Sequence, residues 1–197
     1  HAEKGAIATV SAIPVPIEEA SRFGIIQVDA DWRIVGFQEK PKNPTPLPDD
    51  PTKALASMGN YIFNSNELQF LLNQDHDLKG SSHDFGKDII PSLVDSKRLF
   101  AYNFFWNKIP GHRADLPQYW MDVGTLKAYY EANMDLRSTH PQLDLYNKRW
   151  PIFNYHLSLP PAKFVHNEEV GQDGLPRIGK SINSLVCDGC IISGSTV

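Results

Sequence analysis

The pair Glu39–Lys40 is a candidate for ligand binding, because it stands where an apolar strand-like segment ends, in the stretch GFQEKPKNPTPLPDD. A lysine there offers a compact positive charge suited to a phosphate group, and a neighbouring carboxylate suits sugar hydroxyls. Strand ends in open α/β sheets commonly face the ligand crevice. Pro41 fixes its own φ and favours an extended conformation for Lys40. On residue types alone, a solvated ion pair at a strand end is the favoured alternative.

Two small residues are further candidates for ligand contact. Ser57 opens the segment Ser57-Met58-Gly59 and could donate a hydrogen bond to a ligand. Gly24, which follows Phe23, permits a close approach of the backbone, as does Gly59. The alternatives are a serine that starts a strand and glycines that packing requires, and residue types alone favour these alternatives.

Asp122, in the stretch YWMDVGT, precedes the clearest helical pattern of the chain. One interpretation is a helix N-cap whose carboxylate interacts with the helix dipole. The other is a carboxylate that holds Mg²⁺ beside substrate phosphates, since Mg²⁺ usually takes one or two such ligands and keeps several waters. Residue type and position alone favour the cap.

Cysteine and histidine give weaker signals. Cys187 and Cys190 form a single CxxC, whereas structural zinc needs four ligands, so we interpret the two cysteines as structural residues. His83 beside Asp84 is interpreted as a polar cluster at the start of a helix. The sequence has no Walker A loop, no GxGxxG and no nucleophile elbow, so these residues by themselves lack a triphosphate site.

Alternating strand-like and helix-like segments carry these residues and predict an α/β layered domain. Residues 23–29 and 33–39 flank a short turn and predict a β-hairpin, so the sheet should be mixed. Asn64 and Glu67 have the spacing of a capping box, and Pro91 predicts a kink or break in a helical segment. Further strands are predicted at 6–13, 57–63 and 98–105, helices at 65–73 and 123–137, and a proline-rich loop at 41–53.

Beyond residue 138 the pattern changes. Residues 139–176 are rich in proline and aromatic residues without a clear period, so we expect an ordered connector. Apolar residues then recur every six positions, at Leu185, Ile191 and Val197, which predicts the first coil of a parallel β-helix in 177–197. Residues 1–138 form the preceding domain. Because the chain starts at His1 and ends within the repeat, we expect an internal fragment of a longer protein.

The composition is ordinary for a soluble globular protein, with 41% hydrophobic and 21% charged residues among 197. A net charge of −4 without lysine or arginine runs argues against a nucleic-acid or membrane partner. No apolar stretch approaches the roughly 18 residues of a transmembrane helix, and no signal peptide opens the chain. The low cysteine content fits a reducing cytosol, so we expect a cytoplasmic protein.

Several stretches, in order over nearly the whole chain, resemble bacterial ADP-glucose pyrophosphorylase, also called glucose-1-phosphate adenylyltransferase: FGIIQVD, GFQEKPKNP, LASMGNYIF, SSHDFGKDIIP, YWMDVGT and SLPPAKF. EKP is shared by many sugar nucleotidyltransferases, whereas SSHDFGKDIIP with ASMG is more specific to the ADP-glucose branch. The resemblance implies a Rossmann-like nucleotidyltransferase domain followed by a left-handed parallel β-helix. It also implies an allosteric, homotetrameric enzyme that uses Mg²⁺ to make ADP-glucose and pyrophosphate from ATP and glucose 1-phosphate, for glycogen biosynthesis.

The resemblance further implies individual residue roles. Lys40 matches the lysine that grips the sugar phosphate, and Gly24, Glu39 and Ser57 match further sugar-phosphate contacts. Asp122 matches one of two aspartates that hold Mg²⁺, so Lys40 and Asp122 are the expected catalytic residues. The family's glycine-rich loop, its other metal aspartate and most of its allosteric contacts have no counterpart in these residues. We therefore expect the chain alone to be inactive.

Other functions stay open on the sequence alone. One is a nucleotidyltransferase for another sugar phosphate, against which SSHDFGKDIIP argues. Another is a non-catalytic regulatory subunit that keeps the fold, against which Lys40, Ser57 and Asp122 argue. A third is a hexapeptide-repeat acyltransferase, which leaves the preceding α/β segment unexplained.

Overall fold

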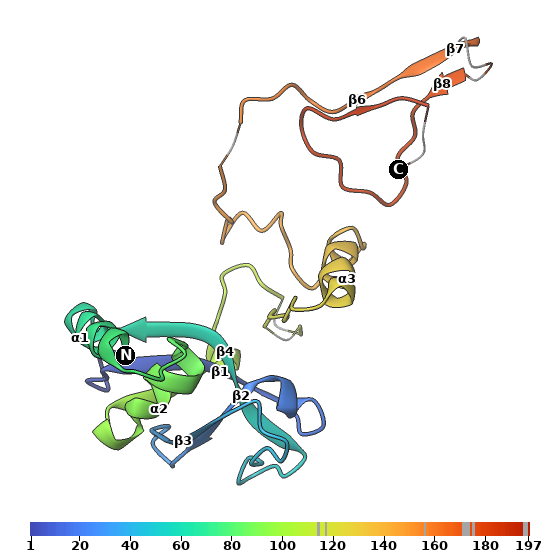
Figure 1. Ribbon diagram of the computed structural model, residues 1–197. Helices are drawn as coiled ribbons and strands as arrows, with labels where there is room; N and C mark the ends of the chain where they lie inside the picture. Colours follow the sequence, from blue (N-terminus) through green and yellow to red (C-terminus); the bar gives the residue numbers. More distant parts are fainter. Residues whose placement is uncertain (114, 117, 156, 171–173, 175, 195–196) are drawn as a thin grey trace. The chain divides into compact units, whose positions relative to one another are not determined.

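A five-stranded mixed sheet organises the first unit, His1–Asn107, of a computed structural model that describes all residues except 114, 117, 156, 171–173, 175, 195 and 196. The strands are β1 (Ala8–Pro16), β2 (Gly24–Val28), β3 (Ile34–Glu39), β4 (Lys53–Phe63) and β5 (Leu99–Asn103). Their order is β3-β2-β4-β1-β5. Figure 1 labels β1 to β4. β5 runs parallel to β1 and the other neighbours are antiparallel, which confirms the predicted hairpin and mixed sheet.

Short helical segments complete the first unit. They are α1 (Ser65–Asp77), a π-type turn (Phe85–Ile89), α2 (Ile90–Ser92) and 3-10 turns at Ala20–Arg22, Val94–Ser96 and Phe104–Trp106. Asp84 caps the π-type turn, because its Oδ1 accepts hydrogen bonds from the amides of Gly86 (2.8 Å) and Lys87 (2.9 Å). The predicted break is confirmed, since the helix type changes at Ile90 and Pro91 lies in the first turn of α2.

The core lies between the sheet and the segment that contains α2. Ala8, Val10 and Ala12 alternate along β1 and belong to one apolar cluster with Ile90 and Leu93. Each of these side chains is at most 6% exposed. Burial of one large aliphatic side chain contributes roughly 1.5–3 kcal/mol. This contact therefore fixes the turn that precedes α2 relative to the strands.

Several local predictions differ from the structure; the strand predicted at 6–13, for example, is β1 at Ala8–Pro16. β4 begins at Lys53 rather than 57, because β1 offers pairing partners over that whole length. β5 ends at Asn103, whose side chain caps the following 3-10 turn. The predicted capping box is wrong, because the Asn64 amide donates to the Ala6 carbonyl at 3.0 Å and makes no cap bond in α1.

The second unit, Lys108–Val197, contains α3 (Leu126–Leu136) and two small sheets among its described residues. β6 (Lys163–Phe164) pairs in parallel with β9 (Ile191–Ile192), and β7 (His166–Val170) pairs antiparallel with β8 (Pro176–Ile178). The helix predicted over 123–137 is confirmed, although it begins later, at Leu126, whereas the β-helix stays a prediction. Within the described ranges of the whole chain, no helix is long and apolar enough to cross a membrane.

Candidate functional site

The end of the β2–β3 hairpin holds the first of the predicted site residues. Gly24 is buried and pairs with Glu39 in the antiparallel register. A Cβ atom at Gly24 would lie 2.5 Å from Cζ of Phe37 and 3.0 Å from Oε2 of Glu39. Packing alone therefore requires glycine at this position, and a ligand contact by Gly24 stays a prediction.

The Glu39 carboxylate is also approached by the π-type turn. A Cβ atom at Gly86 would lie 2.7 Å from Oε2 of Glu39. The hydrogen bond from the Gly86 amide to Asp84 holds the turn in this position. The side chain of Glu39 is 23% exposed. Its carboxylate thus lies between two glycines from separate segments and remains accessible to solvent.

A bulge in β4 brings Ser57 close to Tyr61. In the register with β1, residues 58–60 oppose the single residue Ser11. Gly59 accommodates the bulge with a φ of +72°, and its amide donates to the Ser57 hydroxyl at 3.3 Å. In a regular strand, four residues would separate the two side chains by roughly 13 Å. The bulge shortens this path and lets both face the same place.

Tyr61 is hydrogen-bonded to Ser57, and the charge of the Glu39 carboxylate acts on its phenol. Burial raises the pKa of the Tyr61 phenol, a hydrogen bond with Ser57 lowers it, and the charges of Glu39 and Asp84 raise it further. The net pKa lies above its ordinary value of 10.0, so the phenol stays protonated and keeps an O–H group that can donate to a ligand. The Tyr61 ring also stacks on Phe85 with centroids 5.5 Å apart and planes 17° apart. The arrangement offers hydrogen-bonding groups beside an aromatic surface.

Lys40 departs from its predicted extended conformation. Its φ is +45°, in the left-handed region. β3 ends at Glu39, and the Lys40 amide donates to the Phe23 carbonyl at 3.1 Å, a bond that outweighs the preference imposed by Pro41. The side chain is 66% exposed, with Nζ 3.7 Å from Oε1 of Glu39. Such an exposed ion pair is weak, so the ammonium group is available to a ligand.

Asp122 lies in the second unit, before α3, and its Oδ1 accepts a hydrogen bond from the Gly124 amide at 3.1 Å. Thr125 is the N-cap of the helix, because its hydroxyl accepts from the Ala128 amide at 3.1 Å. The capping interpretation of Asp122 is therefore wrong, and its role as a metal ligand stays a prediction. In the described part of the chain, no group of three or more His, Cys, Asp or Glu residues is placed to hold a metal ion.

The weaker sequence signals make other contacts. His83 forms the predicted polar cluster, with Nδ1 2.7 Å from Oδ2 of Asp75. Cys187 and Cys190 are free and exposed, and the Cys190 amide donates to the Cys187 carbonyl at 3.3 Å across a turn. Neither cysteine packs as a core residue.

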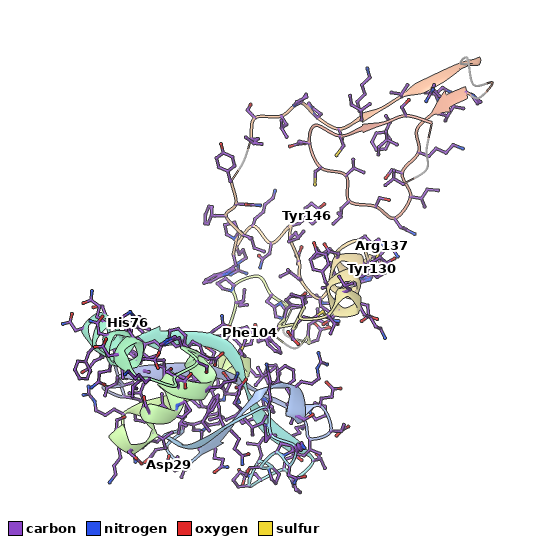
Figure 2. All side chains as sticks on the ribbon, in the orientation of Figure 1. Asp29, His76, Phe104, Tyr130, Arg137 and Tyr146 are labelled. Atoms are coloured by element: carbon purple, nitrogen blue, oxygen red, sulfur yellow. The ribbon has the colours of Figure 1, made fainter. Side chains whose placement is uncertain are left out.

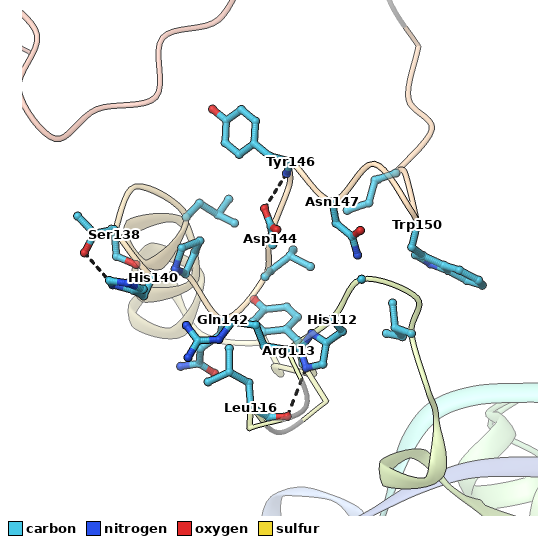
Figure 3. Close-up of a pocket in the computed structure, with 18 of the residues that line it drawn as sticks. His112, Arg113, Leu116, Ser138, His140, Gln142, Asp144, Tyr146, Asn147 and Trp150 are labelled. Atoms are coloured by element: carbon cyan, nitrogen blue, oxygen red, sulfur yellow. Dashed lines mark hydrogen bonds between the residues drawn. The ribbon is translucent and has the colours of Figure 1, made fainter.

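A cavity of about 480 Å³ lies in the second unit near the C-terminal end of α3 (Figure 3). Its lining includes Arg113, Arg137, His140 and Tyr146. Arg113 forms two hydrogen bonds with Asp115, of 3.1 and 2.6 Å, and the C-terminal end of a helix carries partial negative charge. The positive charge of the cavity is therefore offset. None of the predicted site residues, all of which the structure describes, lines it.

Comparisons with known proteins identify the family. Residues 1–139 match the sequence family described as nucleotidyl transferase. The chain belongs to this family. Over 197 residues it is 54% identical to proteins named glucose-1-phosphate adenylyltransferase from Yersinia pseudotuberculosis serotype O:1b (strain IP 31758) and Yersinia pestis (strain Pestoides F). The match covers 100% of the chain but only 44% and 40% of these relatives, so the chain spans less than half of their length.

In this nucleotidyl transferase the structure adds Tyr61, Asp84, Phe85 and Gly86 to the residues around Glu39. Sequence reasoning did not select them as site residues, because helical periodicity assigns Phe85 to an apolar face. The available signal is Gly86 itself. A glycine inside a helical segment is less stable there than alanine, so its presence points to a packing or functional reason.

Proposed function

We propose that the chain supplies the glucose 1-phosphate site of a glucose-1-phosphate adenylyltransferase. Such an enzyme makes ADP-glucose and pyrophosphate from ATP and glucose 1-phosphate, for glycogen biosynthesis. The observation that carries the proposal is the position of the Glu39 carboxylate between Gly24 and Gly86, where its charge acts on Tyr61, the hydrogen-bond partner of Ser57. Family membership and the names of the relatives support the reaction class.

The proposed roles divide between the sugar and its phosphate. Glu39 accepts hydrogen bonds from sugar hydroxyls, while the Ser57 hydroxyl and the protonated Tyr61 phenol donate. The exposed Lys40 ammonium neutralises the sugar phosphate and orients it for in-line attack on the α-phosphorus of ATP, without taking a proton. Gly24 suits this arrangement because, without a side chain, it leaves room for the Glu39 carboxylate.

Asp122 is the proposed ligand for Mg²⁺. A shared site suits this ion, which takes one or two carboxylates and completes its shell with water and substrate phosphates. A carboxylate is a ligand of the kind that Mg²⁺ takes, and the Gly124 amide, 3.1 Å from Oδ1, helps to position that of Asp122. When bound, Mg²⁺ neutralises charge on the transferring phosphoryl group.

The proposal extends to the surrounding architecture. Residues 1–138 belong to the C-terminal half of a Rossmann-like catalytic domain, 139–176 to a connector and 177–197 to the start of a left-handed parallel β-helix. The parallel pairing of β6 with β9 supports the last assignment, because a β-helix stacks parallel strands. The resemblance supports a cytoplasmic, allosteric homotetramer without nucleic-acid or membrane partners. It also supports an ATP site outside these residues.

Titration calorimetry with glucose 1-phosphate tests the binding role. Lys40→Ala removes the proposed phosphate contact, and Lys42→Ala is the matched control from the same exposed loop. We expect saturable binding by the wild type and the control, and at least a tenfold loss in Lys40→Ala, because a hydrogen bond to a charged group contributes about 1.5–3 kcal/mol. Equal affinities would remove Lys40 from the site. Failure of the folded wild-type chain to bind would refute the proposal for this chain.

Steady-state kinetics tests the catalytic role in a protein extended to the length of the relatives. Lys40→Ala is expected to raise KM for glucose 1-phosphate more than it lowers kcat, because Lys40 binds and orients without proton transfer. Binding of the sugar phosphate without turnover in that protein would instead indicate a regulatory subunit.

A further inference from the structure

A buried carboxylate at the end of α1 holds the loop that leads into the π-type turn. Asp75 is only 7% exposed. Its Oδ1 accepts a hydrogen bond from the Ser81 hydroxyl at 2.6 Å, and its Oδ2 lies 2.7 Å from Nδ1 of His83. Because a carboxylate only accepts hydrogen bonds, Nδ1 is the protonated nitrogen of this imidazole. One side chain thus anchors two positions of the loop.

His83 adopts an unusual backbone conformation in this loop. Its φ is +56°, a value that residues with a Cβ atom seldom take, and its amide donates to the Ser81 hydroxyl at 3.0 Å. Such conformations persist where surrounding contacts over-determine them, and they cluster at functional sites. The contacts of Asp75 with Ser81 and His83 hold the His83 backbone in this conformation.

The residues that follow His83 are those that reach the sugar-phosphate site. Asp84 caps the π-type turn, Phe85 stacks on Tyr61, and Gly86 abuts the Glu39 carboxylate. A displacement of the backbone at His83 therefore moves all three groups together. The far side of the turn is held separately, because Asp88 accepts from the Ser82 hydroxyl at 2.6 Å and from the Asp84 amide at 3.0 Å.

We propose that Asp75 and His83 are positioning residues, which hold residues 84–86 against Glu39 and thereby set the affinity for the sugar phosphate. The inference rests on the proposed function of this site. Hydrogen bonds from Ser81 and His83 lower the pKa of Asp75, which keeps the anchoring carboxylate ionised as a strong acceptor. Neither Asp75 nor His83 contacts the ligand in this proposal.

The neighbouring pair on α1 provides a matched control. His76 and Asp77 also form an imidazole–carboxylate contact, with Nδ1 3.1 Å from Oδ1, but both side chains are 85% exposed. His76 is labelled on α1 in Figure 2. Asp77→Asn therefore makes the same chemical change as Asp75→Asn, two residues away, without touching the loop.

Hydrogen exchange and calorimetry together test the proposal in the whole chain. Asp75→Asn replaces the charged acceptor by an amide. His83→Gly removes the imidazole while suiting the left-handed backbone, so it keeps the chain folded if Asp75→Asn does not. We expect faster exchange of the Gly86 and Lys87 amides in both variants, with roughly tenfold weaker binding of glucose 1-phosphate. Asp77→Asn should match the wild type in both measurements.

The two measurements separate the possible failures. Unchanged exchange in both folded variants would show that the pair does not hold the turn and would overturn the proposal. Faster exchange with unchanged affinity would also overturn it, because the turn would then not set binding. A wild-type chain that does not bind glucose 1-phosphate would refute the proposed function, and the positioning role with it, whatever the exchange rates.

Discussion

Replacement of Gly86 by alanine separates ligand binding from stability at the proposed site. The added Cβ atom would lie 2.7 Å from Oε2 of Glu39. A carbon and an oxygen without a covalent bond normally stay at least about 3.3 Å apart, so the carboxylate must withdraw by roughly 0.6 Å. Glu39 is a flexible side chain with a partly exposed end, so it is able to make that movement.

The two expected effects of Gly86→Ala differ in size. Alanine stabilises by about 0.4–1 kcal/mol where the backbone permits it, by reducing the entropy of the unfolded chain. A shifted rotamer of Glu39 costs roughly 0.5–1.5 kcal/mol, so the free energy of unfolding should change by less than about 1 kcal/mol. A displaced carboxylate, however, loses a hydrogen bond to a sugar hydroxyl that contributes about 1.5–3 kcal/mol. We therefore expect affinity for glucose 1-phosphate to fall at least tenfold.

Calorimetric titration and urea unfolding of the same variants provide the measurement. Gly36→Ala is the matched control, because its Cβ atom would lie 2.6 Å from Oε1 of Gln27, another flexible side chain on the β2–β3 hairpin. The control should keep the wild-type affinity. Wild-type affinity in Gly86→Ala would refute the assignment of Glu39 as a ligand contact. Equal losses of affinity in both variants would instead point to general strain in the hairpin.

Two further predictions concern stability. Hydrogen bonds from Thr52 and Lys53 lower the pKa of Asp50 from 3.8 to about 2. The ionised carboxylate therefore stabilises the fold above pH 3.8, and this contribution is lost as the pH falls towards 2. Thermal unfolding at several pH values should show a weaker loss of stability in acid for Asp50→Asn than for the wild type. Thr125→Ala removes the cap of α3 and should lower the free energy of unfolding of the second unit by about 1 kcal/mol. Urea unfolding of both variants provides the measurement, and Asp122→Ala should lower the free energy of unfolding by less than Thr125→Ala. A larger loss in Asp122→Ala would instead support Asp122 as the helix cap, as its position in the sequence suggests.

Local patterns predicted the elements whose contacts are themselves local. The β2–β3 hairpin is an example, because Asp29 in its turn accepts hydrogen bonds from the amides of Asp31 and Arg33, both at 2.9 Å. The cap of α1 failed for the opposite reason. The side-chain amide of Asn64 donates to the carbonyl of Ala6, 58 positions earlier in the chain, and its Oδ1 contacts the imidazole of His1; local spacing carries no information about such contacts.

The candidate site divides in the same way. Residue type and family resemblance selected Glu39 and Ser57, but their shared environment depends on a bulge at Gly59 and on the approach of Gly86. The bulge depends on the pairing of β4 with β1, and the approach of Gly86 depends on the packing of the π-type turn against β3. A bulge exists only relative to the partner strand, which has fewer residues over the same stretch. The sequence of β4 alone therefore does not reveal it. The position of Tyr61 was for this reason beyond the reach of pattern analysis.

Both segments that meet at Glu39 contain a non-glycine residue in the left-handed backbone region. Lys40, with φ of +45°, directly follows Glu39, and His83, with φ of +56°, directly precedes Asp84. Each such conformation costs roughly 1–3 kcal/mol. Hydrogen bonds offset this cost, from the Lys40 amide to a backbone carbonyl and between the His83 imidazole and buried Asp75. Contacts within the fold itself therefore offset the strain. Because a group that is already in place loses less entropy on binding, we expect the proposed site to be preorganised rather than assembled by the sugar phosphate.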